Sequence, residues 1–142
     1  MSNQDYIHPS AEQQKSFYEA YKDKGKIVML NLLKFRKQAD YTDFDHLKPD
    51  KDITGQEAYL TYMNSVTPIF DKVGGQMIYY GNSGDFLIGP SSEQWDAVLL
   101  VTYPSIEAFM GLALDKGYEA IAGHRTAALA DSRLLPTLSP MG

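Results

Sequence analysis

Two chemically capable side chains stand next to each other late in the chain, in the segment YEAIAGHRTAALADSRLLP (118–136). The imidazole of His124 can act as a general acid or base, and the guanidinium of Arg125 can hold a carboxylate or an enolate. Neighbouring helical residues point about 100° apart, so both face one pocket only where the helix ends. Alternatively, both cations stabilise a helix C-terminus, with Arg125 paired to Asp131. The functional interpretation makes His124 and Arg125 the candidate catalytic residues.

Three further positions are candidates for binding a ligand. Asn31 is the one polar residue inside the apolar run VMLNLL. A buried amide needs partners, so Asn31 either bonds across a sheet or subunit boundary or lines a pocket. Trp95 and Asp96 follow Glu93, and a carboxylate beside an indole can acquire a raised pKa and act as a base. The alternative for this pair is a solvated aspartate beside a packed tryptophan.

Tyrosine is abundant, with ten in the chain. A pocket lined by several tyrosines would suit a planar aromatic molecule, which their hydroxyls would orient. Tyrosines at helical or strand spacing also belong to ordinary cores, and both interpretations stay open. The candidate ligand-binding tyrosines are Tyr59, Tyr80 and Tyr118.

Several kinds of chemistry are disfavoured by composition. The chain has no cysteine, which excludes disulfides and thiolate nucleophiles. The aspartate-rich stretch ADYTDFDHLKPDKD (39–52) lacks the glycine and the closing glutamate of a calcium loop. We therefore expect no metal and no cofactor. A net charge of −5 argues against nucleic acid, no apolar run approaches the roughly 20 residues of a membrane span, and the polar first residues favour a cytoplasmic location.

Periodicity and capping signals predict the order of the elements. The first half of the chain is expected to form a helix from Ser10 to about Lys24, a strand over 26–35 and a long surface loop over 36–52. A helix of about 18 residues, kinked at Pro68, follows TGQE (54–57), and a strand over 76–81 leads into a hairpin arm. The second half is expected to form a strand over 95–104, a helix capped by Ser105, a helical stretch from Asp115 that holds Arg125, and a strand over 132–138. We expect an N-terminal helical extension over 1–25 and a single domain over 26–142.

The order strand, helix, strand, strand, helix, strand is the split βαβ or ferredoxin-like pattern. It predicts an α+β fold with helices on one face of a four-stranded antiparallel sheet. The strands over 26–35 and 95–104 are apolar on both faces, so the second face needs a cover. A second copy of the chain would supply it, because monomers rarely expose large apolar patches. The N-terminal helix is the alternative cover.

Four segments in this order resemble a known family: IVMLNLLKFR (27–36), GQEAYLTY (55–62), LIGPSSEQWDAVLLVTYPSIEAF (87–109) and YEAIAGHRTAALADSRLLP (118–136). They are similar to the bacterial family called domain of unknown function 1330, over about residues 26–136. The resemblance implies a dimeric α/β barrel, in which two ferredoxin-like subunits pack sheet against sheet. The wider superfamily includes monooxygenases, isomerases, haem-dependent dismutases and ligand-binding proteins, so the fold alone fixes no chemistry.

The combined expectation is a homodimer whose subunits each bind a small organic molecule between sheet and helices. A cofactor-independent oxygenation or isomerisation would use His124 as acid or base and Arg125 as anion holder. Asn31 and a tyrosine would position the substrate. The alternative is a non-catalytic ligand-binding or structural dimer, in which the same residues stabilise a helix end and an interface.

Overall fold

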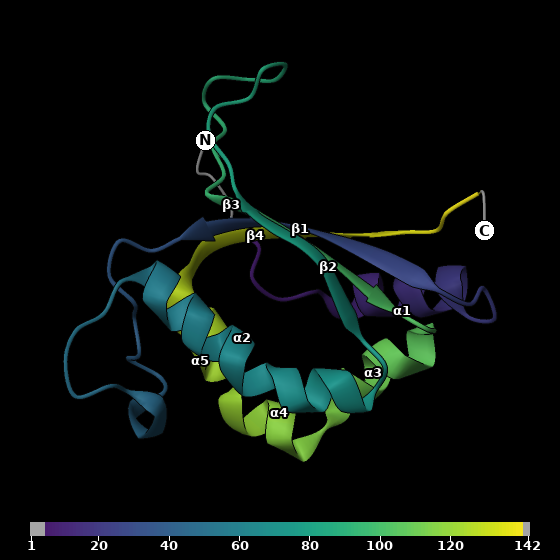
Figure 1. Ribbon diagram of the computed structural model, residues 1–142, viewed down its shortest axis with the longest axis horizontal. Helices are drawn as coiled ribbons and strands as arrows, with labels where there is room; N and C mark the ends of the chain where they lie inside the picture. Colours follow the sequence, from purple (N-terminus) through teal and green to yellow (C-terminus); the bar gives the residue numbers. More distant parts are fainter. Residues whose placement is uncertain (1–4, 141–142) are drawn as a thin grey trace.

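A four-stranded antiparallel sheet with the strand order β2-β3-β1-β4 forms one layer of the protein, and helices form the other (Figure 1). The computed structural model describes residues 5–140. The elements in chain order are α1 (Ala11–Tyr21), β1 (Ile27–Phe35), the 3₁₀ helix η1 (Asp45–Leu47), α2 (Gly55–Lys72), β2 (Gln76–Asn82), β3 (Ala97–Tyr103), α3 (Ile106–Leu114), α4 (Lys116–Ile121), α5 (Gly123–Ala128) and β4 (Leu129–Thr137). This topology confirms the predicted ferredoxin-like α+β fold with an N-terminal helix.

Local capping signals fix the helix starts. Ser10 and Gln13 form a capping box at α1, and Thr54 and Glu57 form one at α2. Asp115 accepts hydrogen bonds from two backbone N–H groups at the start of α4, as expected. Each of these side chains satisfies backbone donors that the first helical turn leaves free. Helix α2 continues through Pro68 to Lys72.

The boundaries near the last strand differ from the prediction. The helical stretch after Asp115 is divided into α4 and α5, and β4 begins at Leu129 rather than at 132. Leu129 pairs with Phe35 across an irregularity in β1. That irregularity extends the ladder to the end of α5, and nothing in the local sequence marks it.

The long loop over 36–52 is anchored rather than freely solvated. Its backbone N–H groups at Ala39 and Asp40 donate to the carbonyls of Ile53 and Ala127, at 2.9 Å each. Tyr41 is buried in the main core cluster. A Cβ on Gly123 would lie only 2.5 Å from the ring of Phe44, so the loop packs against α5 at a point where only glycine fits. The predicted surface loop is confirmed, but Tyr41 and Phe44 anchor it to the core and to α5.

The sheet has one covered and one uncovered face. Ile27, Met29 and Leu33 of β1 point to the helices and are buried. On the opposite face, Leu30 of β1 pairs with Leu100 and Leu135, and Leu32 pairs with Val98, whereas Val28 pairs with two threonines. We call this the open face: Val28, Leu30, Leu32, Val98, Leu100 and Leu135.

Helix α1 does not cover the open face. Phe17 of α1 packs edge to face on Phe109 of α3, with ring centroids 5.4 Å apart. The Tyr21 hydroxyl donates to the carbonyl of Pro136 in β4. Both contacts hold α1 on the helical side, so the alternative in which the N-terminal helix shields the second face is wrong.

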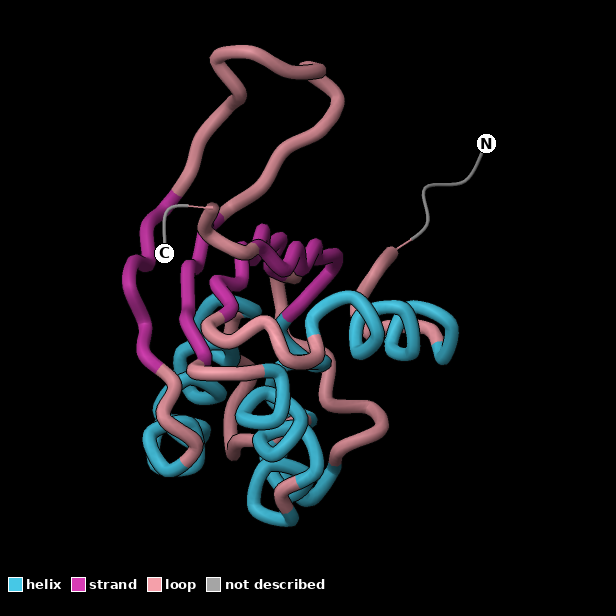
Figure 2. The backbone as a smooth tube through the Cα atoms, turned by 90° about the vertical axis from the view of Figure 1, so that its right-hand side faces the viewer, coloured by secondary structure: helices cyan, strands magenta, loops and turns pink. Residues whose placement is uncertain are grey.

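Residues 83–96 form an arm between β2 and β3 that projects away from the helices, on the side of the open face (Figures 1 and 2). The Ser83 hydroxyl donates to the carbonyl of Trp95, and Gln94 donates to Asp85, so the arm is closed by its own hydrogen bonds. At its tip, Leu87 is 98% and Ile88 91% exposed. In the described part of the chain, no helix is long and apolar enough to cross a membrane.

Candidate functional site

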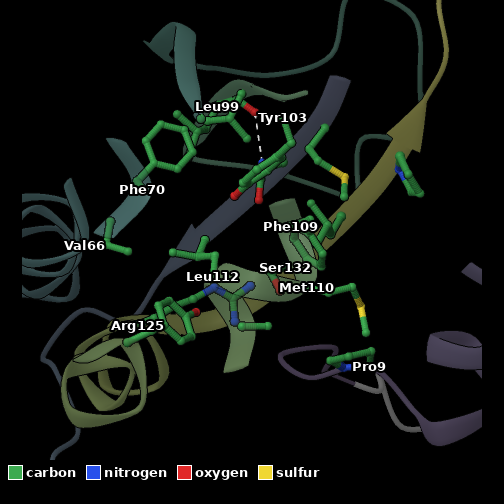
Figure 3. A pocket seen from close by; sticks show the side chains of 18 of the residues that line it. Pro9, Val66, Phe70, Leu99, Tyr103, Phe109, Met110, Leu112, Arg125 and Ser132 are labelled. Atoms are coloured by element: carbon green, nitrogen blue, oxygen red, sulfur yellow. Dashed lines mark hydrogen bonds between the residues drawn. The ribbon is translucent and has the colours of Figure 1, made fainter. Parts of the chain in front are cut away.

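An open cavity of about 1900 Å³ lies between the covered face of the sheet and the helices (Figure 3). Its floor is formed by residues of β1 and β3, among them Asn31, Leu99 and Tyr103. Helices α2 and α3 form two of its walls. Helix α1 and the segment before it form a third wall. Aromatic rings line it at right angles: Phe70 and Tyr103 lie 5.5 Å apart at 89°. The cavity is therefore mostly apolar, with a few polar groups set into it.

Asn31 is one of these polar groups. It is 8% exposed, and its Nδ2 donates to the carbonyl of Leu99 at 3.2 Å. That bond fixes the orientation of the amide, because only nitrogen can donate to a carbonyl. The Oδ1 atom has no hydrogen-bond partner within residues 5–140. Asn31 thus satisfies both predicted alternatives, since it bonds across the sheet and also lines a pocket.

Four tyrosines line the same cavity: Tyr59, Tyr62, Tyr103 and Tyr118. The hydroxyls of Tyr62 and Tyr118 are 3.0 Å apart and bond to each other. Burial raises the pKa of Tyr59, Tyr62 and Tyr103. These phenols are therefore neutral at pH 7, and each keeps a proton to donate.

Arg125 reaches into the cavity from α5, near Leu112 and Ser132 (Figure 3). Its Nη1 donates to the carbonyl of Ile7 at 2.8 Å. The expected pairing with Asp131 is wrong, because that carboxylate bonds to Arg133 at 2.7 Å. No carboxylate within residues 5–140 lies within 4.0 Å of the Arg125 guanidinium.

His124 lies elsewhere. It is 8% exposed and is not among the cavity-lining residues. Its Nδ1 is 2.7 Å from the hydroxyl of Tyr41 in the long loop. Burial, and then the nearby His46, lowers the pKa of His124, so the ring is neutral at pH 7. The structure therefore separates the two neighbours: Arg125 faces the cavity and His124 faces the loop.

Three other predicted ligand-binding residues also lie outside the cavity lining. The hydroxyl of Tyr80 is buried and has no hydrogen-bond partner in the described part of the chain. Trp95 is 5% exposed, and its Nε1 donates to Glu93. Asp96 Oδ2 accepts from the backbone N–H of Phe35 at 2.8 Å, which joins the ends of β1 and β3. Of the predicted ligand-binding set, the cavity brings together Asn31, Tyr59 and Tyr118.

The cavity also contains residues outside the predicted ligand-binding set. Tyr62 lies three positions after Tyr59 on one helix face, a spacing that places both on the same wall. Tyr103 ends the apolar strand β3. His8 belongs to a polar segment without periodicity, so no signal could have found it. Within residues 5–140 there is no group of three or more histidines and carboxylates able to hold a metal ion.

Residues 50–136 match the sequence model of the family described as Domain of unknown function (DUF1330). The chain belongs to this family. The expected resemblance is thereby confirmed. A protein of unknown function from Rhodopseudomonas palustris, RPA0582, is 36% identical, and the match covers 96% of this chain and 100% of that one with a TM-score of 0.82. No functionally curated protein matches the sequence.

More distant solved structures share the fold. A dimeric ferredoxin-like protein of unknown function from Jannaschia sp. is 10% identical, with a TM-score of 0.52 over 81% of this chain and 100% of that one. SnoaB, a cofactor-independent oxygenase from Streptomyces nogalater, is also 10% identical, with a TM-score of 0.50 over 81% of this chain and 93% of that one. At this identity, the likeness concerns the fold alone.

Proposed function

We propose that this DUF1330 protein binds a small, largely apolar organic molecule in the cavity between sheet and helices. One observation carries the proposal. The cavity is lined by polar groups of buried residues that lack protein partners within residues 5–140, namely Asn31 Oδ1 and the hydroxyls of Tyr59 and Tyr103. Buried polar groups are normally paired. A ligand with matching groups would pair them, and the aromatic walls would bind its apolar body.

The binding unit in this proposal is a homodimer formed through the open faces of two subunits. Its support is the row of apolar side chains on the open face, including Leu30, Leu100 and the 56% exposed Leu135. The arm projects on the same side and exposes Leu87 and Ile88 at its tip. The Jannaschia protein of the same fold is described as dimeric. Stacking two open faces, with each arm on the partner, would bury this surface.

Catalysis in the same cavity is a second candidate function, favoured by His8. This residue lines the cavity, and burial, followed by the charge of Arg125, lowers its pKa. A neutral imidazole can accept a proton near pH 7. Isomerisation by proton shift needs such a base, and so does oxygenation without a cofactor, which needs a substrate carbanion. His124 would act only through its neighbours, since it lies outside the lining.

A thermal-shift screen with small aromatic acids, amides and phenols tests the binding function. A compound present at about 100 times its dissociation constant should stabilise the fold by about 2.7 kcal/mol. The shift should shrink in the Tyr59→Phe and Tyr103→Phe variants, which lose the free hydroxyls. Tyr18→Phe is the matched control, because Tyr18 is exposed on α1 and does not line the cavity. Shifts that all survive in both cavity variants would place the ligand elsewhere.

The second candidate is tested with any compound that the screen identifies. Incubation in air, followed by mass spectrometry of the compound, should show a product with wild type and none with His8→Gln. The variant should keep the thermal shift. An unchanged compound after prolonged incubation with wild type would leave binding as the sole function.

A further inference from the structure

We infer that the cavity binds a monocarboxylate: an apolar or aromatic acid whose carboxylate is held by Arg125 and whose hydroxyl or N–H group donates to Asn31 Oδ1. The inference rests on the proposed binding function and specifies its ligand. It comes from the charges of the cavity and from the orientation of one amide.

The charge balance of the cavity favours an anionic ligand. Arg133 also lines it, but Asp131 neutralises this guanidinium at 2.7 Å. His8 is neutral at pH 7, because burial and the Arg125 charge lower its pKa. The two lining carboxylates, Glu12 and Asp71, are exposed and form no ion pair. Arg125 is therefore a cation of the cavity without a counter-charge among residues 5–140.

The free donors of Arg125 have the geometry to bind a carboxylate. A guanidinium has five N–H donors in a planar fork, and the carbonyl of Ile7 is the acceptor that Arg125 meets in the protein. The remaining donors match a carboxylate in bidentate fashion. A phosphate monoester carries nearly two negative charges at pH 7 and would need a second cation. One free cation therefore favours the carboxylate.

Asn31 would bind the opposite end of the ligand. Asn31 lies on β1 in the sheet floor, whereas Arg125 projects from α5. One N–H of Asn31 Nδ2 donates to Leu99, which orients the amide and leaves Oδ1 as an acceptor without a partner among residues 5–140. A ligand donor is needed there. Between these two polar points the lining is apolar and aromatic, with Leu99, Tyr103 and Phe70 among its residues.

Matched probes test the inference by isothermal titration calorimetry. The probes are 6-hydroxy-2-naphthoate, its uncharged amide 6-hydroxy-2-naphthamide, and 2-naphthoate, which lacks the hydroxyl. Wild type should bind the hydroxy acid about tenfold or more tightly than the amide, since a charge-assisted hydrogen bond contributes about that factor, and about fivefold more tightly than 2-naphthoate, which lacks one neutral hydrogen bond. Arg125→Gln should remove the preference over the amide. Asn31→Leu should remove the preference over 2-naphthoate.

Two further variants guard against misfolding and general charge effects. Arg125→Lys keeps the charge and a donor for Ile7, and should retain part of the preference for the acid. Lys116→Gln removes an exposed cation that does not line the cavity and should bind like wild type. All variants are compared at equal ionic strength, because salt screens exposed charges.

The outcomes separate the two proposals. Equal binding of acid and amide to wild type would overturn the monocarboxylate inference and leave the binding function intact. A preference for the acid that survives in Arg125→Gln would overturn the role of Arg125. Failure of all three probes to bind wild type would overturn the monocarboxylate inference, whereas the binding function would be overturned only if the thermal-shift screen also found no ligand.

Discussion

His124 makes a buried contact that responds to pH. The residue is 8% exposed, its Nδ1 meets the Tyr41 hydroxyl, and burial followed by His46 lowers its pKa from the usual 6.5. In the unfolded chain this histidine takes up a proton as pH falls through about 6.5, while the folded protein keeps it neutral to a lower pH. Between the lowered pKa of His124 in the folded protein and the value of about 6.5 in the unfolded chain, the unfolded state binds more protons than the folded state. The stabilising contribution is therefore complete above pH 6.5 and is lost as pH falls below it.

We predict that the free energy of unfolding of wild type falls as pH is lowered from about 7 to 5, with up to about 1.4 kcal/mol per pH unit from His124. His124→Gln should be less stable than wild type at pH 7 and should show a shallower decrease. Urea unfolding at several pH values measures both. Tyr41→Phe is the companion variant, because it removes the hydroxyl but leaves His124 able to titrate. Equal slopes for wild type and His124→Gln would contradict the prediction.

For individual residues, the sequence predicted part of the cavity lining. Asn31 stood out because a polar residue inside an apolar strand must find partners, and its amide does face the cavity. Arg125 was recognised for its chemistry, but the sequence could not show that His124 would point the other way. The direction of each side chain depends on where α5 begins and on the loop packed against it. His8 reaches the cavity through tertiary contacts alone.

Gly55 illustrates a constraint at the scale of elements. It is the first residue of α2, and its backbone lies against β1 and the end of α5. A Cβ at this position would lie 2.3 Å from the carbonyl oxygen of Arg36 and 2.5 Å from that of Ala128. Both atoms belong to the backbone, and the Gly55 N–H donates to the same Arg36 oxygen at 3.0 Å. Neither can move without breaking the junction of these elements.

We predict that Gly55→Ala lowers the free energy of unfolding by about 3 kcal/mol, because forced overlap in a packed region typically costs this much. Gly84→Ala in the arm is the control, since a Cβ there meets nothing within 4 Å. It should change stability by less than about 0.5 kcal/mol. Denaturant unfolding measures the free energy of unfolding of both variants. A Gly55→Ala protein as stable as wild type would contradict the prediction and show that the junction can shift.

The helix starts with a side-chain cap were predictable from sequence, whereas the uncapped start of α5 and the start of β4 were not. Ser10, Thr54 and Asp115 cap helices through bonds to residues two or three positions away, so the signal is local. The start of β4 depends on its pairing with Phe35 across the irregularity in β1. Such pairing joins residues distant in the chain, and no local pattern encodes it. The ferredoxin-like order of strands and helices was nevertheless predicted correctly, because it depends on the type of each element rather than on where the element begins and ends.

At the scale of the whole molecule, the two faces of the sheet have different proposed roles: one lines the cavity and the other forms the dimer interface. The covered face and the helices enclose the cavity, whose lining extends from Tyr6 to Pro136. Ligand binding there should therefore stabilise the fold globally. The open face and the arm present apolar residues outward, on the side away from the cavity. Dimerisation through this face would leave the cavity entrance free.

The proposed dimer makes the final prediction. Wild type at micromolar concentration should have twice the chain mass of 15.9 kDa in sedimentation equilibrium. Leu135→Glu places a charge on the open face, and the double variant Leu87→Ser with Ile88→Ser removes the exposed tip of the arm. These side chains are all more than half exposed in the subunit, so the substitutions should spare its fold. Each variant should shift the equilibrium toward monomer, because charge burial opposes association in the first and lost apolar contact weakens it in the second.

Leu114→Ser is the matched control for this experiment. Leu114 is 77% exposed at the end of α3, in the helical layer and away from the open face. It should remain dimeric. If Leu135→Glu dissociates the dimer and the arm variant does not, the sheet faces alone hold the subunits together. A monomeric wild type would contradict the proposed interface. A dimer that is insensitive to both variants would contradict it as well, because the subunits would then associate through another surface.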